Sequence, residues 1–347
     1  MNKWIFISAS LLPMFFIGCT EHSLGGDSLP NEDVLINFSA GYSVDYDIEV
    51  ATEEQQELTP GEATRTTIQK EMGVFCVAAT EYDVEDDVDC LYGITEESFC
   101  HNLYNAKYRG TISTEKRNPI NPVDTLLRTY PIEENSAIAA YAYYPYNVNE
   151  NIEMGDTSWY VKLNLIEEKM LTDYCYTGKI FKTKKNARNG ENIDLTFRHA
   201  FAKVKLNFEV IFEKDTSKDY IRIESFQMGL SGNGEGLLDL KNGNFYPKDS
   251  NETAFEIQEI KDAAESNKLV AETTMYIPPA LKLKYVKIVY RKRSSNELIT
   301  RVHRFEREPN YEKGVGYSID IWLIVPEYPN GFKFNSNVEA DAELEIL

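Results

Sequence analysis

The segment from Leu195 to Val210 reads Leu-Thr-Phe-Arg-His-Ala-Phe-Ala-Lys-Val-Lys-Leu-Asn-Phe-Glu-Val. From Ala202 onward apolar residues alternate with polar ones, so that alternate side chains point to the same side. A period of two, carried by β-branched and aromatic residues, is typical of a strand that buries one face against a core. The segment therefore predicts a central strand of a β-rich body.

Composition limits the class of protein. The chain has 347 residues, enough for two domains, and its 42% hydrophobic and 12% aromatic content indicates a folded body. The net charge is −20, from 56 acidic and 36 basic residues. Nucleic acids and anionic membrane surfaces bind basic proteins, so neither is expected as a partner of the folded body.

Further strand-like runs follow the central segment, each separated from the next by turn residues. They are Ile221–Leu230, Gly236–Leu240, Met275–Ile277, Val286–Tyr290, Leu298–Phe305 and Tyr317–Val325. A helix is expected only at residues 254–269, and residues 182–190 and 232–236 are expected to form a loop and a hairpin turn. The absence of a strand–helix–strand rhythm disfavours a parallel α/β sheet and favours β-sandwiches.

The first nineteen residues predict export. Lys3 precedes a short apolar run, residues 4–17, which is too short to span a bilayer comfortably and is typical of a signal segment. Phe16-Ile-Gly-Cys19 resembles a lipobox, in which the cysteine sulfur is lipidated, although Phe16 replaces the usual leucine. An ordinary signal peptide is the alternative. We expect a lipoprotein signal at residues 1–18 and attachment to the membrane through a lipid on Cys19.

Residues 20–64 contain eleven acidic residues and no Lys or Arg. The Gly/Ser-rich start of this segment is suited to a tether. Within it, one strand is expected from perfect alternation of apolar and acidic or polar positions. Its apolar residues are Tyr42, Val44, Tyr46, Ile48 and Val50. Residues 51–64 are expected to be an exposed loop, which ends at Arg65, the first site for an Arg-specific protease, with Thr66 as the new N-terminus.

The last ten residues, 338–347, alternate in the same way and predict a strand that is free to leave its own domain. The residues of one face are Val338, Ala340, Ala342, Leu344 and Ile346. A helix is the competing interpretation, because Glu, Ala and Leu favour helices.

Catalytic and metal-binding patterns are not apparent. The four histidines, including His199, have no metal-ligand spacing with cysteines or carboxylates, and His199 is expected to be a packed or hydrogen-bonded residue. No nucleophile motif occurs, so the sequence predicts neither an enzyme nor a cofactor. Apart from Cys19, four cysteines allow three disulfide pairings, of which Cys90 with Cys100 is the candidate to test first, while Cys76 fits a buried strand.

Several motifs resemble the fimbrillin-like family, the pilins of type V pili in Bacteroides-type bacteria. They are Phe197-x-His-Ala-x-Ala-Lys-Val204, Arg65-Thr-Thr-Ile68, Gly73-Val-Phe75, Ala142-Tyr-Tyr-Pro-Tyr146, Gly236-x-Leu-Asp-Leu-x-x-Gly243 and Gly314-x-x-Tyr-x-Ile-x-Ile321. Tyr141, Tyr143, Tyr144 and Tyr146 fit strand packing better than a ligand platform. The resemblance implies an all-β fold with two transthyretin-like β-sandwich domains in tandem, which we place at residues 66–192 and 193–347, after a tether and removable strand at 19–65.

The resemblance also implies a function. The family's pilins are exported as lipoproteins, cleaved after an arginine and polymerised into an outer-membrane fimbrium. The partners would be an Arg-specific protease, other pilin subunits and a ligand on a host or bacterial surface. A neighbour's C-terminal strand would replace the released N-terminal strand by strand addition. The alternatives are a tip or anchor pilin, or a surface lipoprotein that does not polymerise and binds glycans.

Overall fold

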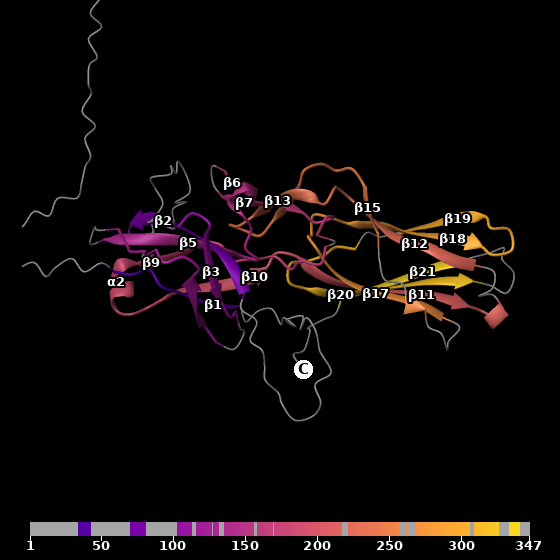
Figure 1. Cartoon of the computed structure of the whole chain (residues 1–347), viewed down its shortest axis with the longest axis horizontal. Coiled ribbons are helices and arrows are strands. Elements are labelled where there is room, and N and C mark those ends of the chain that lie inside the picture. Colours follow the sequence, from indigo (N-terminus) through magenta and orange to yellow (C-terminus); the bar gives the residue numbers. More distant parts are fainter. Residues whose placement is uncertain are drawn as a thin grey trace, which may run out of the picture. The chain divides into compact units, whose positions relative to one another are not determined.

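The computed structural model divides into two units, residues 1–32 and 33–347. It describes residues 34–42, 70–80, 103–112, 116–126, 128–131, 135–155, 158–168, 170–216, 221–256, 261–262, 268–305, 309–325 and 333–340, all within the second unit. The described residues form strands with two short helical turns, η2 (Asn149–Asn151) and α2 (Lys184–Arg188) (Figure 1). The predicted all-β fold class is therefore confirmed.

The described strands make four sheets. The eight-stranded sheet contains, in spatial order, β2 (Lys70–Thr80), β3 (Ala106–Gly110), β4 (Asn118–Pro122), β1 (Phe38–Tyr42), β10 (Ile193–His199), β8 (Cys175–Tyr176), β5 (Ser136–Tyr144) and β9 (Ile180–Thr183). The five-stranded sheet contains β16 (Lys261–Asp262), β17 (Lys268–Ile277), β11 (Ala202–Phe212), β20 (Gly316–Val325) and β21 (Lys333–Ala340). The third sheet contains β15 (Thr253–Glu256), β12 (Ile221–Leu230), β18 (Leu283–Lys292) and β19 (Leu298–Arg304). The fourth contains β14 (Phe245–Pro247), β13 (Glu235–Asp239), β7 (Trp159–Asn164) and β6 (Ile152–Met154).

The eight-stranded sheet closes on itself. Strand β2 pairs with β3 on one side and with β5 on the other, so the pairings run β2-β3-β4-β1-β10-β8-β5 and back to β2. We call these seven strands the ring. Each of them contributes to one buried apolar cluster: Val74, Tyr108, Ile120, Phe38, Leu195, Cys175 and Ile138, in the same order. Because only one face of each strand joins this cluster, the cluster fills the interior of the ring.

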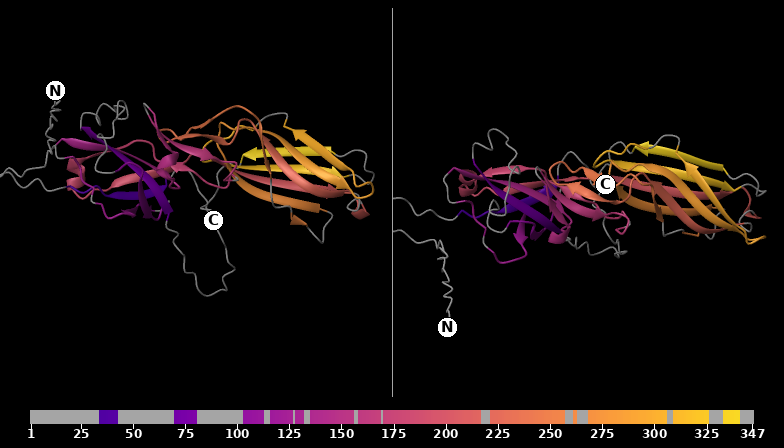
Figure 2. Two further views of the ribbon diagram at one scale, coloured as in Figure 1. Left: turned by 45° about the horizontal axis from the view of Figure 1, so that its top comes forward. Right: turned by 90° about the horizontal axis from the view of Figure 1, so that it is seen from above.

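The central segment spans two strands, β10 and β11, which belong to different sheets. In β11 the predicted face is buried: Ala202, Val204, Leu206, Phe208 and Val210 are each at most 1% exposed. Phe208 stacks on Phe226 of β12 with ring centroids 3.9 Å apart. The five-stranded sheet thus packs face to face on the sheet of β12, β18 and β19, as Figures 1 and 2 show. This pair of sheets is a β-sandwich.

Three local predictions are wrong. The described residues of the range 254–269 are strands and not a helix, because Thr253–Glu256 pair with β12, Lys261–Asp262 form β16 and Lys268 begins β17. Residues 232–236 are not a hairpin turn, because the flanking strands β12 and β13 lie in different sheets. Residues 182–190 are not only a loop, since they contain the end of β9 and the helix α2. In each case the segment's own sequence pattern was weak. Its structure was determined by pairing with a distant strand or, for α2, by Thr183, whose side chain caps the helix N-terminus.

Two other expectations concern the N-terminal half. Tyr141 and Tyr143 lie in β5 and are fully buried, which confirms strand packing for these two residues. The domain boundary at residue 193 stays a prediction. Strand β10, directly after that position, pairs with β1 and β8 of the ring, and the chain enters the five-stranded sheet only at Ala202.

The turn between β13 and β14 gives a first testable prediction. Gly243 has a left-handed φ of 69°, and a Cβ there would overlap the ring of Tyr176. Gly190 has a similar φ of 80°, but nothing lies within 4 Å of its Cβ position. Since alanine pays about 1 to 2 kcal/mol for such a backbone and about 1 to 3 more for a forced overlap, Gly243→Ala should lower the free energy of unfolding clearly more than Gly190→Ala. Urea unfolding checks this, and equal losses would contradict the overlap.

Candidate functional site

The first candidate element is β1, which occupies the position between β4 and β10 in the ring. Its residues pair in parallel with β10 (Phe38 opposite Ile193) and antiparallel with β4 (Phe38 opposite Ile120). Among the described strands no other pairing connects β4 to β10. Removing β1 would therefore open the ring and leave two strand edges with unpaired backbone groups.

Side chains and backbone on both sides hold the segment 34–42. Val34, Ile36, Phe38, Ala40 and Tyr42 are 9% exposed or less, and Phe38 meets Tyr108 edge-on at 5.1 Å. The N–H of Ile36 donates to the carbonyl of Arg128 at 2.8 Å, and the N–H of Tyr130 donates to the carbonyl of Val34 at 2.9 Å.

Polar contacts then join β1 to β10. The hydroxyl of Ser39 donates to Asp194, and the guanidinium of Arg117 donates to the carbonyl of Tyr42 at 3.2 Å and to the Thr196 hydroxyl at 2.8 Å. Segment 34–42 is therefore packed and hydrogen-bonded like a core strand. In the sequence, 27 residues separate its end at Tyr42 from the next described strand, which starts at Lys70.

The burial of β1 predicts a contrast between two neighbouring positions. Phe38→Ala should lower the free energy of unfolding by about 3 to 5 kcal/mol, because it leaves a cavity inside the ring. Leu35→Ala, in the same segment but 46% exposed, should change it by no more than about 0.5 kcal/mol. Urea unfolding of both variants measures the difference. Similar small effects on the free energy of unfolding would mean that segment 34–42 is not packed in the ring in solution.

The second candidate element is β21, at the edge of the five-stranded sheet. It pairs antiparallel with β20, with Ile319 opposite Val338 and Tyr317 opposite Ala340. The strand begins at Lys333, five residues before the predicted donor strand, and the described part ends at Ala340. Ala342, Leu344 and Ile346 lie outside the described residues. For residues 338–340 the structure has the predicted strand and not the competing helix.

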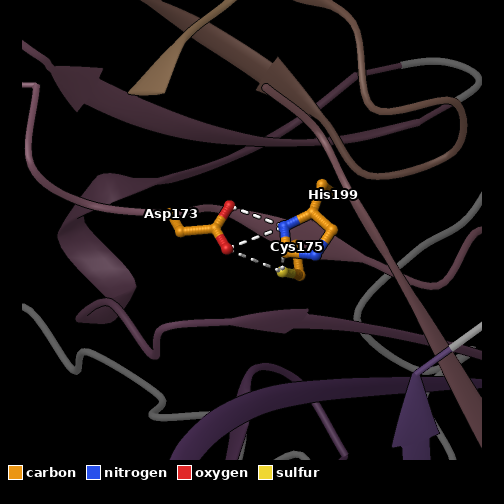
Figure 3. Close-up of side chains that lie close together, drawn as sticks. All are labelled: Asp173, Cys175 and His199. Carbon is orange, nitrogen blue, oxygen red and sulfur yellow. Dashed lines mark hydrogen bonds and ion pairs between the residues drawn. The ribbon is translucent and has the colours of Figure 1, made fainter. Parts of the chain in front are cut away.

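The third candidate element is a cluster of Asp173, Cys175 and His199, which Figure 3 shows converging on one point. Cys175 opens β8 and stands opposite His199, the last residue of β10, while Asp173 lies two residues before Cys175. Residues opposite each other on paired strands, and residues two apart along an extended chain, share a face. The strand register therefore brings the three side chains together.

Distances within the cluster place all three functional groups around one nitrogen. His199 Nδ1 lies 2.8 Å and 2.7 Å from the two Asp173 oxygens and 3.6 Å from Cys175 Sγ, and Sγ lies 4.0 Å from Asp173 Oδ2. His199 and Cys175 are buried, and Asp173 is 20% exposed. His199 Nε2 is buried with no hydrogen-bond partner among the residues that the structure describes.

This arrangement does not fit a cysteine nucleophile. In Cys–His–Asp catalysts the thiol and the carboxylate contact opposite ring nitrogens, so that a proton can pass through the imidazole. Here both contact Nδ1. Burial, with the nearby Asp173 charge as a smaller cause, raises the pKa of the Cys175 thiol well above its usual value. The thiol is therefore neutral at pH 7, and a neutral buried thiol is a poor nucleophile.

Tyr42 of β1 covers the cluster. Its ring stacks on the imidazole of His199 with centroids 5.7 Å apart and planes inclined by 6°. Burial raises the pKa of the Tyr42 hydroxyl, and Cys175 and Asp173 raise it further, so the hydroxyl stays protonated. The end of β1 and the cluster are thus in direct contact.

A surface cavity of about 690 Å³ lies elsewhere, over the fourth sheet. Its lining includes Lys162, Glu168, Glu235, Tyr246 and Lys248. Tyr246 is 47% exposed, and Lys248 pairs with Glu235 at 3.1 Å. An exposed aromatic ring beside carboxylates and amides is the kind of surface on which sugars stack and form hydrogen bonds.

The other predicted site residues lie outside the described part of the chain. These are Cys19, Val44, Tyr46, Ile48, Val50, Arg65, Thr66, Cys90 and Cys100. Cys76, by contrast, is described and fully buried in β2, as expected of a small core residue.

The sequence predicted no metal ligands, and the cluster around His199 was not apparent from it. Asp173-x-Cys175 is a spacing that places two side chains on one face of an extended chain, and this was the available signal. The pairing of the two-residue strand β8 with β10 could not be inferred, because so short a strand has no periodicity.

Comparison with known proteins gives one family. A family model described as fimbrillin-like matches residues 62–339. No curated protein matches. No helix among the described residues has the length and apolar character needed to cross a membrane.

The solved structures that are similar to this chain include the following three. A candidate cell adhesion protein from Bacteroides uniformis is 12% identical, with 90% of this chain and 99% of that chain covered and a TM-score of 0.48. A fimbrial protein from Bacteroides vulgatus is 14% identical, with 78% and 92% covered and a TM-score of 0.44. The fimbrial anchor protein Mfa2 from Porphyromonas gingivalis is 11% identical, with 89% and 98% covered and a TM-score of 0.38.

Proposed function

Since the chain belongs to the fimbrillin-like family, we propose that it is a pilin-type adhesive subunit of a cell-surface fimbrium and polymerises by strand exchange. The observation that carries the proposal is the position of β1. It is an N-terminal strand that completes the ring between β4 and β10, yet precedes the first candidate cleavage site at Arg65.

Export and maturation would proceed from the N-terminus. The signal at residues 1–18 would direct the chain to lipidation at Cys19, and the lipid would hold the precursor on the outer membrane. An Arg-specific protease would then cut between Arg65 and Thr66. The two predicted β-sandwich domains, 66–192 and 193–347, would remain as the mature subunit.

Cleavage would convert a closed precursor into an acceptor. The released piece would contain β1 itself, Phe38–Tyr42, together with the strand predicted at residues 42–50. Loss of β1 would expose the apolar interior of the ring and the backbone edges of β4 and β10. An extended segment of another subunit could restore both by strand addition.

The donor would be the C-terminal strand of a neighbouring subunit, residues 338–347. Donor and acceptor surfaces differ, so each subunit could accept one strand and donate another, and such heterologous contacts propagate into a filament. Because β21 pairs with β20 within the chain, residues 338–340 would have to leave that edge before they are donated.

The proposed maturation predicts the N-terminus of the surface protein. Wild-type protein from the fimbrium should begin at Thr66, whereas Arg65→Ala should remain lipid-anchored and keep its N-terminal segment. Arg65→Lys is the matched control. It keeps the positive charge but lacks the side chain that an Arg-specific protease requires, so it should also remain uncleaved. N-terminal sequencing and membrane fractionation measure both. A start at Thr66 in Arg65→Ala would overturn the assignment, and a blocked, acylated Cys19 in the wild type would favour an anchor subunit or a surface lipoprotein that binds glycans.

A second function, glycan binding by a surface lipoprotein that does not polymerise, is favoured by the cavity beside Tyr246. Tyr246→Ala should reduce binding to a glycan array at least about tenfold if the ring is a stacking platform, whereas Val148→Ala, also an exposed apolar residue, should not. Absence of any bound glycan in the wild type would exclude this second function.

A further inference from the structure

We propose that Asp173, Cys175 and His199 bind a zinc ion under the end of strand β1. The three side chains offer one thiolate sulfur, one imidazole nitrogen and carboxylate oxygens, all within 4.8 Å of one another. Sulfur and nitrogen donors with a carboxylate are a donor set that zinc prefers among the common divalent ions of cells, whereas calcium and magnesium take oxygen donors.

The distances fit a tetrahedral ion. Zinc lies about 2.0 to 2.2 Å from nitrogen and oxygen ligands and about 2.3 Å from sulfur, which places tetrahedral ligand atoms roughly 3.3 to 3.6 Å apart. The observed separations are 3.6 Å for Nδ1 and Sγ, 4.0 Å for Sγ and Oδ2, and 2.8 Å for Nδ1 and Oδ1. Only the Asp173 carboxylate has to move to reach these separations, by about 0.5 Å. As a partly exposed side chain it has room to do so.

Paired strands hold two of the three ligands in place, and the ring of Tyr42 covers the site. Cys175 and His199 are fixed by the register of β8 and β10, on either side of one strand pairing. Sites built on paired strands hold their ligands more firmly than sites on loops. The ring of Tyr42 shields the imidazole, and the partly exposed Asp173 leaves one route for an ion.

Without an ion, the Cys175 thiol has only long, weak hydrogen-bond contacts. Sγ is at 3.6 Å from a nitrogen that already contacts both oxygens of Asp173, and its distance of 4.0 Å to Oδ2 is long. When zinc binds, the sulfur–hydrogen bond of Cys175 breaks, the proton leaves to solvent, and the sulfur electron pair forms the bond to the ion. The fourth coordination position would be taken by water.

The test is metal binding by the full-length protein, purified without a polyhistidine tag in a reducing buffer. Isothermal titration with zinc should give one tight site, and cobalt in its place should show thiolate-to-cobalt charge transfer in the absorption spectrum. Cys175→Ser should remove the charge transfer and weaken zinc binding at least about tenfold. Cys76→Ser is the matched control: it alters another fully buried thiol next to the ring interior and should leave both signals intact.

Asp173→Asn keeps the inference falsifiable if Cys175→Ser does not fold. This change removes the charge but keeps the shape of a partly exposed side chain, and it should also weaken zinc binding at least about tenfold. Double replacement of Cys90 and Cys100 by serine should have no effect on the ion. The proposal is wrong if wild-type protein binds no zinc, or if its zinc and cobalt signals persist in both Cys175→Ser and Asp173→Asn.

Discussion

A chain that begins at Thr66 is expected to be unfolded or aggregated as an isolated monomer. It lacks β1 and the buried side chains of Val34, Ile36 and Phe38. Each fully buried side chain of this kind contributes about 1.5 to 3 kcal/mol, so the loss is roughly 5 to 9 kcal/mol. This is comparable to the whole stability of a typical domain, about 5 to 15 kcal/mol. Urea unfolding followed by circular dichroism and gel filtration measures the effect.

The matched control begins at Asp33. This chain lacks the same first unit, residues 1–32, but keeps β1, and it should unfold at the urea concentration of the full chain. A synthetic peptide of residues 33–42 added to the chain that begins at Thr66 should restore the folded form, whereas the same peptide with Phe38→Asp should not. If the chain that begins at Thr66 unfolds like the full chain without any peptide, β1 is not needed to close the ring and the proposed acceptor does not exist.

Removing the C-terminal strand is expected to abolish polymers without unfolding the monomer. Deletion of residues 338–347 removes the proposed donor, while β20 keeps its parallel pairing with β11 along its whole length. Gel filtration of the uncleaved deletion variant, which keeps β1, should show a folded monomer, and electron microscopy of the processed variant should show no polymers. Polymers of normal length from this deletion would show that the donor lies elsewhere in the chain.

A reversible lock tests whether β21 must leave β20. Ser318 and Glu339 are opposite partners in this antiparallel pair, whose Cα atoms lie about 4.5 to 5.5 Å apart, within the range of a disulfide. The double variant Ser318→Cys with Glu339→Cys should form no polymers when oxidised and normal polymers after reduction. Each single cysteine variant is the control. Equal polymerisation of the oxidised and reduced forms would restrict the donor to residues after Ala340.

The strands of the C-terminal half were the most predictable part of the fold. In β11 a run of alternating residues faces one core and is flanked by two neighbours, so the pattern and the burial agree from Ala202 to Val210. The predicted Ile221–Leu230 matches β12 to the residue. Strong periodicity persists in such strands because one face is buried along their whole length.

The ring could not be predicted from the sequence in the same way. Strands β2 and β5 are buried on both faces, since one side fills the ring and the other packs on the second core, and such strands lose the alternation that reveals them. The removable N-terminal strand was predicted at residues 42–50, of which the structure describes Tyr42 alone, and the described strand is Phe38–Tyr42. Its short apolar run gained its strand character from β4 and β10, which lie far away in the chain.

The same separation decides the order in which the molecule can fold. Phe38 is made early, but its partner Ile193 in β10 follows 155 residues later, so the ring cannot close until more than half of the chain has been synthesised. Pairings between such distant residues form slowly, because the entropy of closing the intervening chain opposes them. Slow closure would leave the gap between β4 and β10 open early in folding, as it would be after the proposed cleavage. An exported subunit would need its own N-terminal strand close at hand during that interval, and tethering it to the same chain supplies it at high local concentration.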